Sequence, residues 1–396
     1  MLRTLMTLSP GCSRGAAPAV LLAAAVLASG CAIATDDVGA RAAPDKAAAP
    51  PAGAWIDLAS VQPMDKLAQK LADRRVVLVG ETHTRYDHHL QQLAILKALH
   101  ARHPKMALGV EWFQQPAQPH LDDYVAGRIT EAEMIERTGY FDRWRFDYRL
   151  YRPVLQYARE HGIPIVALNA PVELTNRISE VGVEGLTAEE RAGLPDIDRS
   201  NTDYARYLRR FFDQHPGERR NFDRFLDVQL TWDESMAERA ATYLKQNPDR
   251  HMVLMAGSGH LAYRWGIPDR LKRRLPGTPM ATVLFDDGSP ANPRVGDYLV
   301  FSPEQTLPAA GLLGLYLDTT PEGVKVKGMA EDSAAGAAGI KDGDLLLAID
   351  EQPIGSYAAL RMAMIERRPG ERINLRYQRK PMWGSPGEKT VEVVLR

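Results

Sequence analysis

Five short apolar runs, separated by stretches with helical spacing, constrain the fold of this chain most strongly. The runs are residues 76–79, 106–110, 163–168, 252–255 and 281–285. Helical patterns lie between them, at residues 89–99, 152–160 and 222–245. Continuous apolar strands that alternate with helices are typical of a parallel sheet covered on both faces. The sequence therefore predicts an α/β domain with a mostly parallel sheet. Residues 111–160 and 172–247 hold no convincing strand, so we expect them to form helical insertions that build a lid over the sheet.

Polar side chains follow these predicted strands at the points where the strands end. Glu81 and His83 follow the first, Glu111 the second, Asn169 the third and His260 the fourth. Ligands of open parallel sheets bind at the carboxyl ends of the strands, and residues two apart in extended backbone share one side. We expect Glu81, His83, Glu111 and His260 to converge over one crevice. There they can hold a metal or another bound group, or act in acid–base chemistry. The alternative is that strand-end residues cap the following helices, which suits Asn169 best.

A cluster of aromatic and arginine residues occupies the first insertion. Aromatic faces suit a flat macrocycle, arginines suit its propionates, and a tyrosine can ligate ferric haem iron. The alternative is that aromatics at helical spacing pack as core. The candidate cofactor contacts are Trp144, Arg145, Tyr148, Tyr151 and Asn169. His88 and His89, at the start of a predicted helix, are expected to be solvated, although His88 can instead point at the crevice.

The start of the chain has the pattern of an export signal. A positive start with Arg3 and Arg14 precedes a short apolar run, and small residues lead directly to Cys31. This pattern resembles the lipobox of bacterial lipoproteins, in which the cysteine carries the lipid; an ordinary secretory signal is the alternative. We predict a lipoprotein signal peptide at residues 1–30, lipidation of Cys31, and a flexible tether at residues 31–54. Ala32 follows the cysteine, so the resemblance implies a lipid anchor in the outer membrane, on the periplasmic side of the cell envelope.

Charge and cysteine content bear on two questions, nucleic-acid binding and disulfide bonds. The chain has 396 residues, a formal net charge of -1 and 2 cysteines. A near-neutral charge gives no electrostatic reason to expect nucleic acid. Cys12 precedes the apolar run of the signal, so Cys31 alone remains in the mature chain and no intrachain disulfide is expected.

The last part of the chain has the pattern of a second, small β-rich domain. A Gly-Asp turn at Gly343 and Asp344 precedes an alternating strand, and residues 311–396 together resemble a PDZ domain, with a linker at residues 302–310. The resemblance implies a short helix at residues 333–339 and a groove helix at residues 357–367. PDZ domains capture peptide carboxyl termini by adding a strand to a sheet edge. The predicted carboxylate-binding loop is Leu313, Gly314, Leu315 and Tyr316.

The motifs of the first domain also resemble a known family. Gly80-Glu81-Thr82-His83, a later Glu111, and Gly257-Ser258-Gly259-His260 are similar to those of the ChaN family of the haem-binding-uptake and Tiki superfamily. The resemblance covers residues 55–301. It implies a lipoprotein associated with iron and haem acquisition. Distant relatives are Tiki-type proteases and erythromycin-esterase-like hydrolases, and their active centres would correspond here to Glu81, His83, Glu111 and His260.

Three functions remain open on these grounds. The first is binding of haem or an iron complex in support of iron uptake. The second is a metal-dependent or acid–base hydrolase, peptidase- or esterase-like, whose PDZ domain recruits peptide termini. The third is a structural envelope protein whose crevice is vestigial. Haem is the expected cofactor, with a divalent metal as the alternative and His83 and His260 as its candidate ligands. The residues leave open whether the protein is an enzyme and whether it forms a homodimer.

Overall fold

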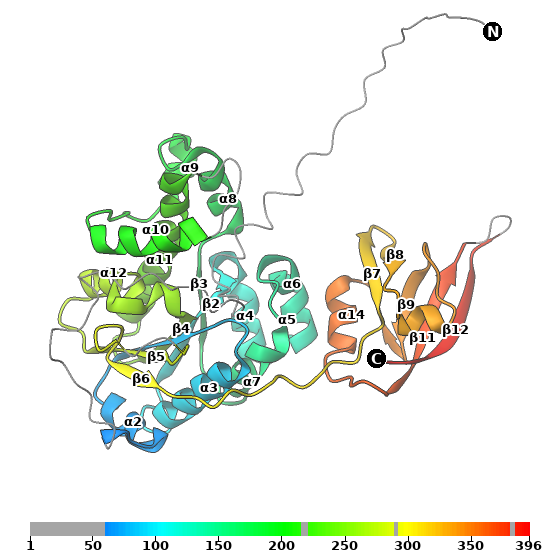
Figure 1. Ribbon diagram of the computed structural model, residues 1–396, viewed down its shortest axis with the longest axis horizontal. Helices are drawn as coiled ribbons and strands as arrows, with labels where there is room; N and C mark the ends of the chain where they lie inside the picture. The colour runs from blue at the N-terminus through cyan, green and yellow to red at the C-terminus, as the bar shows by residue number, and fades with distance from the viewer. Residues whose placement is uncertain (1–59, 215–220, 289–291, 381–384) are drawn as a thin grey trace, which may run out of the picture.

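The structure is a computed structural model that describes residues 60–214, 221–288, 292–380 and 385–396 (Figure 1). Cys31, the predicted signal peptide and the predicted tether lie outside these residues. No helix in the described part of the chain is both long and apolar enough to cross a membrane. Two six-stranded sheets organise the described residues, one within residues 76–300 and the other within residues 315–394.

The first sheet is parallel throughout, with the strand order β3-β2-β4-β1-β5-β6. Its strands are β1 (Val76–Glu81), β2 (Met106–Gln114), β3 (Ile165–Asn169), β4 (His251–Gly257), β5 (Met280–Phe285) and β6 (Tyr298–Val300). The predicted mostly parallel sheet with helical segments is confirmed. Because β4 inserts between β1 and β2, the ends of these three strands are neighbours.

Two details of the sheet differ from the prediction. The second strand was expected to end at Glu111, but β2 continues to Gln114 through a register shift against β3. The edge strand β6 was not predicted, because its three residues are shorter than a typical strand. Glu111 therefore lies within a strand and not at its end. Its neighbours Val110 and Trp112 belong to the apolar cluster on one face of the sheet.

Helices cover both faces of this sheet. One face carries α2 (Met64–Leu71), α3 (Tyr86–His100), α4 (Gln118–Val125), α5 (Glu131–Thr138), α6 (Tyr140–Arg143) and α7 (Tyr148–Glu160). The other face carries α11 (Phe222–Gln246) and α12 (Ile267–Arg274), with α8 (Val172–Val181), α9 (Ala188–Ala192) and α10 (Thr202–Gln214) following along α11. Short 3₁₀ turns lie at Gln115–Ala117, Ser258–His260 and Ala262–Arg264. The helical stretches that we expected to form a lid are thus mainly the two layers that cover the sheet. Both layers are needed because the central strands are apolar on both sides.

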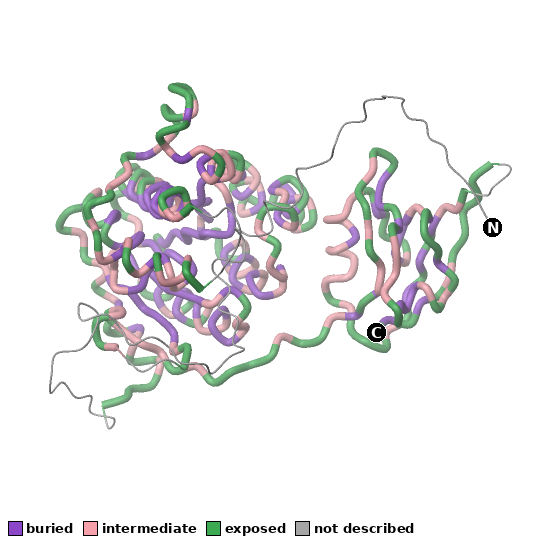
Figure 2. Tube along the Cα trace, turned by 45° about the horizontal axis from the view of Figure 1, so that its top comes forward, coloured by how far each residue is buried: buried purple, intermediate pink, exposed green. Residues whose placement is uncertain are grey.

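Alternation along β1 illustrates how the sheet divides these layers. Val77 and Val79 belong to the apolar cluster with α3 and α7, whereas Val76 and Leu78 belong to the cluster with α11 and α12. Both sets are almost fully buried, and Figure 2 shows the strands as the buried centre of the domain. A strand buried on both faces cannot alternate between apolar and polar residues, which is why the sequence shows continuous apolar runs.

The second sheet is antiparallel, with the order β12-β11-β9-β8-β7 and β10 paired to β9. Its strands are β7 (Leu315–Thr320), β8 (Gly323–Met329), β9 (Leu345–Ile349), β10 (Gln352–Pro353), β11 (Arg372–Arg379) and β12 (Gly387–Val394), with the helices α13 (Ala334–Ala337) and α14 (Tyr357–Ala363). The predicted groove helix is therefore shorter than residues 357–367. β7 lies at the end of the sheet, the position from which a PDZ domain pairs with a peptide.

Candidate functional site

The predicted crevice residues lie at neighbouring strand ends. Glu81 is the last residue of β1 and His83 follows it, Glu111 lies in β2, and His260 lies in the turn after β4. All four side chains are buried, with 1–4% of each residue exposed. Gly80 allows β1 to approach this turn, because an added Cβ would lie 2.8 Å from Ser258 Oγ and 2.5 Å from Leu284 Cδ2. The structure thus brings the four predicted residues together.

Glu81 and His83 form the first carboxylate–imidazole pair. His83 Nδ1 lies 2.6 Å from Glu81 Oε1. Burial raises the pKa of the Glu81 carboxyl, but the facing His83 and His89 imidazoles outweigh it, so this pKa lies below its ordinary value. Glu81 is then an anionic acceptor, and His83 Nδ1–H donates to it. This hydrogen bond fixes the orientation of the ring and turns Nε2 away from Glu81.

Glu111 links this pair to His260. Its Oε2 accepts a hydrogen bond from the backbone N–H of Gly257 at 2.6 Å, and its Oε1 lies 3.5 Å from His260 Nε2. His83 lies over the same glycine. A Cβ added to Gly257 would be 3.3 Å from His83 Nε2 and 3.6 Å from Glu111 Oε2. His83 and Glu111 therefore both lie against Gly257, and Glu111 connects this point to His260.

A second carboxylate, which the sequence analysis did not identify, orients His260. Asp233 Oδ1 lies 2.7 Å from His260 Nδ1, and Asp233 Oδ2 accepts a 2.6 Å hydrogen bond from the Tyr204 hydroxyl. Asp233 is fully buried on α11. The site thus contains two carboxylate–imidazole pairs, Glu81–His83 and Asp233–His260. In both pairs Nδ1 faces the carboxylate and Nε2 faces the region of Glu111.

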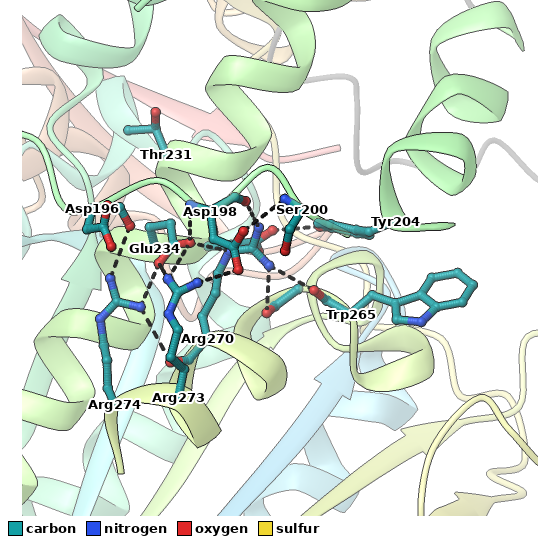
Figure 3. A network of polar contacts seen from close by, with 12 residues as sticks. Asp196, Asp198, Ser200, Tyr204, Thr231, Glu234, Trp265, Arg270, Arg273 and Arg274 are labelled. Carbon is teal, nitrogen blue, oxygen red and sulfur yellow. Dashed lines mark hydrogen bonds and ion pairs between the residues drawn. The ribbon is translucent and has the colours of Figure 1, made fainter. Parts of the chain in front are cut away.

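A buried ionic network next to Asp233 fixes the position of α11 against α12 (Figure 3). The carboxylate of Glu234 is fully buried and pairs with three arginines of α12, at 3.0 Å to Arg270 Nε, 2.8 Å to Arg273 and 2.6 Å to Arg274. Arg270 also donates to the backbone carbonyls of Trp265 and Gly266. These contacts tie α11 to the segment that follows His260, and so keep Asp233 facing that imidazole.

His88 and His89 are buried, not solvated as the sequence analysis expected. His89 Nε2 lies 3.7 Å from Glu81 Oε2, behind the first pair. His88 accepts a hydrogen bond from the backbone N–H of Thr82 through Nδ1 and stacks on Phe285. Burial lowers the pKa of His88 to about 4, against the attraction of Asp87. The start of α3 packs under β1, so the imidazoles of His88 and His89 are buried and neutral. They support the residues of the predicted site from behind.

The predicted aromatic contacts lie in two different places. The ring of Trp144 lies 4.9 Å from the His83 ring, and that of Phe146, which was not singled out as a contact, lies 4.7 Å from it. Tyr148 and Tyr151 are fully buried in the core between α7 and the sheet, where the Tyr151 hydroxyl donates to the backbone carbonyl of His83 at 3.5 Å. The Tyr148 hydroxyl donates to Glu131 at 2.8 Å, away from the crevice.

Burial also bears on the chemistry of these tyrosines. It raises the pKa of both the Tyr148 and the Tyr151 hydroxyl well above the ordinary value. A phenolate ligand to ferric iron is disfavoured in such surroundings. The two residues therefore correspond to the core-packing alternative, because they face the sheet from the buried side of an amphipathic helix.

Arg145 and Asn169 form hydrogen bonds with backbone groups close to them in the sequence. Arg145 is exposed and donates to the carbonyl of Asp142. The Asn169 side chain accepts from the backbone N–H of Ala170 at 2.9 Å. This bond joins Asn169 to the next residue only, and the helix α8 that follows begins after Pro171 without a side-chain cap.

Imidazole nitrogens and carboxylate oxygens are suitable ligands for iron and other transition metals. Nevertheless, among the described residues no group of three or more His, Cys, Asp or Glu side chains is arranged as a metal site. The metal role of His83 and His260 stays a prediction.

Together, the fold and the site define a two-domain protein: a parallel α/β domain with a buried histidine–carboxylate cluster, followed by a PDZ domain. The sequence matches the family described as haem-binding uptake, Tiki superfamily, ChaN over residues 67–271, slightly more than half of the chain, and the chain belongs to this family. Residues 311–393 match the PDZ domain family. Family membership links the chain to haem- or iron-related binding, and the PDZ domain is a module that binds peptides or protein partners.

Known proteins resemble different parts of the chain. The curated protein RETICULATA-RELATED 5, chloroplastic, of Arabidopsis thaliana is 26% identical over an alignment of 244 residues, and the alignment covers 55% of this chain and 32% of that protein. The chain therefore spans about a third of the length of this relative. Among solved structures, "Cofacial heme binding to ChaN of Campylobacter jejuni" covers 59% of this chain and 90% of its own, with 18% identity and a TM-score of 0.49. The PDZ domain of a carboxy-terminal protease from Vibrio cholerae, in complex with peptide, covers 22% of this chain and 95% of its own, with 16% identity and a TM-score of 0.19.

Proposed function

We propose that this protein binds haem or another iron complex in the bacterial cell envelope, in support of iron uptake, and that its crevice holds the iron centre. The observation that carries this proposal is the pair of carboxylate-oriented imidazoles, His83 and His260, that meet beside Glu111. Histidines that ligate metals typically donate their other ring nitrogen to a carboxylate, which fixes the tautomer and raises ligand basicity.

The donor types at this site suit iron, although the described residues form no group of three or more metal-binding side chains. Two imidazoles and one carboxylate are ligands that iron accepts, and the iron, when bound, supplies Lewis acidity or redox chemistry. His83 and His260 would hold it, Glu81 and Asp233 orient the two rings, and Trp144 covers the site. Tyr148 and Tyr151 do not fit as ligands, because both are buried in the core with neutral hydroxyls.

Titration of the purified protein with haemin tests the proposal. We expect a shift of the Soret band that saturates at a fixed ratio, because imidazole ligation changes the electronic state of haem iron. Iron-free protoporphyrin serves as the control for adsorption of the macrocycle alone. If haemin and protoporphyrin bind equally weakly and no spectral shift appears, the haem proposal fails.

The same geometry supports one second candidate, a hydrolase. A buried carboxylate that orients a histidine next to a third carboxylate is also the arrangement of a general base. In this case the PDZ domain would recruit peptides to the crevice. The two candidates differ in a direct assay: a hydrolase cleaves peptides or esters catalytically and loses this activity in His260→Ala, whereas a binding protein gives a stoichiometric complex without turnover.

We also propose that the chain is anchored in the outer membrane through a lipid on Cys31. The support is the lipobox-like sequence that ends at this cysteine. Several acyl chains on one cysteine are sufficient for stable anchoring, whereas a single chain is marginal. Cells labelled with a radioactive fatty acid should incorporate label into the wild type and not into Cys31→Ser, which should leave the membrane fraction or stay unprocessed. Equal labelling of the two proteins would contradict the anchor.

A further inference from the structure

The PDZ helix α14 is shared between the two domains. Leu360 is buried in the apolar cluster of the PDZ domain, and Ala363 packs against that cluster. On its other side, Ala358 and Met362 pack against the apolar cluster of the first domain, as does Ile365 just beyond the helix. Figure 1 shows α14 standing between β7 and the helices α5 and α6. One helix therefore belongs to two hydrophobic cores.

Aromatic and charged contacts fasten α14 to the first domain. The Arg361 guanidinium lies 4.7 Å from the centre of the Phe141 ring, and the Tyr357 ring lies 6.0 Å from that ring, edge to face. Arg361 also donates to the Tyr357 hydroxyl at 3.0 Å. Just beyond the helix, Glu366 pairs with Arg152 of α7. Displacement of α14 away from the PDZ sheet must therefore press on Phe141.

Phe141 begins the segment that covers the crevice. It lies in α6, and Trp144 and Phe146 follow within the next five residues, with both rings against His83. We call residues 144–146 the aromatic flap. Its central residue, Arg145, has a φ of 69°, a left-handed conformation that is strained for a residue other than glycine. The flap therefore covers His83 with a backbone conformation that is uncommon for a residue other than glycine.

The other wall of the PDZ groove is the edge strand β7. Leu315 and Leu317 of β7 pack against the same apolar cluster that contains Leu360 of α14. Tyr316 is exposed, and the far edge of β7 has no partner strand among the described residues. A peptide that pairs with β7 would place its last apolar side chain beside Leu315 and Leu317 and against α14.

We propose that a peptide with an apolar carboxyl terminus, bound between β7 and α14, displaces the aromatic flap and opens the crevice over His83. The peptide pushes α14 toward Phe141, and α6 transmits this displacement to Trp144 and Phe146. Because coupling between two binding sites is reciprocal, a ligand that requires an open crevice also tightens peptide binding. Only the identity of that crevice ligand rests on the function proposed above.

Hydrogen–deuterium exchange on the full chain tests the coupling without haem. The probe is a short peptide ending in Val-Val with a free carboxylate, and its amidated form is the control. We expect the free peptide to protect β7 and to accelerate exchange at residues 144–146 by about 5- to 150-fold, the usual range of coupling between sites. The amidated peptide should do neither.

Two variants separate coupling from binding. In Phe141→Ala the peptide should still protect β7 but no longer accelerate exchange in the flap. The matched control is Phe222→Ala, which removes a similar arginine–phenylalanine contact, with Arg209 at 3.7 Å, on the other side of the first domain. It should behave like the wild type. The proposal is overturned if saturating peptide protects β7 and leaves residues 144–146 unchanged, or if it fails to protect β7. Neither result bears on haemin binding, so the function proposed above stands or falls separately.

Discussion

Replacing Gly257 by alanine is expected to weaken haemin binding by about 10- to 100-fold, the range seen when the surroundings of metal ligands are disturbed. The added Cβ would lie 3.0 Å from His83 Cε1 and 3.6 Å from Glu111 Oε2. His83 cannot yield easily, because Glu81 holds its Nδ1 and Trp144 packs against its ring. The backbone of Gly257, with φ -55° and ψ 138°, suits alanine, so the effect is steric and not a matter of backbone strain.

Gly259→Ala is the matched control for this experiment. It lies two residues along the same Gly-Ser-Gly-His segment, and an added Cβ there would have nothing within 4 Å. Both variants should unfold at the same urea concentration as the wild type to within small differences, whereas only Gly257→Ala should bind haemin weakly. Wild-type affinity in Gly257→Ala would place the iron complex away from Gly257.

Replacing Glu234 by alanine is expected to lower the free energy of unfolding by about 3–5 kcal/mol, the usual cost of breaking a buried ion pair from one side. The carboxylate is fully buried and pairs with Arg270, Arg273 and Arg274. It also accepts a hydrogen bond from the backbone N–H of Asp198. The substitution leaves Arg270, of which 2% is exposed, as a buried charge without its carboxylate.

Urea unfolding followed by circular dichroism measures this loss. The matched control is Asp249→Ala, which removes the carboxylate of an exposed pair with Lys105. Exposed pairs contribute at most about 1 kcal/mol. Glu234→Gln, which keeps hydrogen-bond acceptors but no charge, should fall between the two and provides a measurement if the alanine variant does not fold. A loss below about 1 kcal/mol in Glu234→Ala, similar to that of the exposed pair, would show that the network does not hold α11 in place.

Much of the fold was predictable because the physical signals are local and repeated. Short β-branched apolar runs such as residues 76–79 are typical of strands buried on both faces, and helices between such strands indicate parallel connections. Glu81 and His83 were predictable for the same reason, since the two-residue period fixes their common side. The fifth and sixth strands illustrate the limit: Met280–Phe285 is an apolar run, whereas Tyr298–Val300 is recognisable only through its pairing with β5.

Asp233 could not be found by the same reasoning. It lies in the middle of α11, where an acidic residue ordinarily faces solvent. The available signal was indirect: the stretch of α11 that contains Asp227, Thr231, Asp233 and Glu234 is too polar on every side to present an ordinary apolar stripe. Their burial depends on partners from α10, α12 and the turn after β4, which the sequence does not bring together. Tyr148 and Tyr151 show the opposite case. Their spacing is compatible with cofactor contacts, but it is also the spacing of residues that pack one face of a helix into the core.

The central claim is that His83 and His260 hold the iron centre. The most direct test is the visible absorption spectrum during haemin titration of the wild type, of the double variant His83→Ala/His260→Ala and of His161→Ala, an exposed histidine at the end of α7. The account predicts the same Soret shift in the wild type and in His161→Ala, and its loss in the double variant while all three proteins remain folded. An unchanged Soret shift in a folded double variant would contradict the account, because the iron would then be held by other residues.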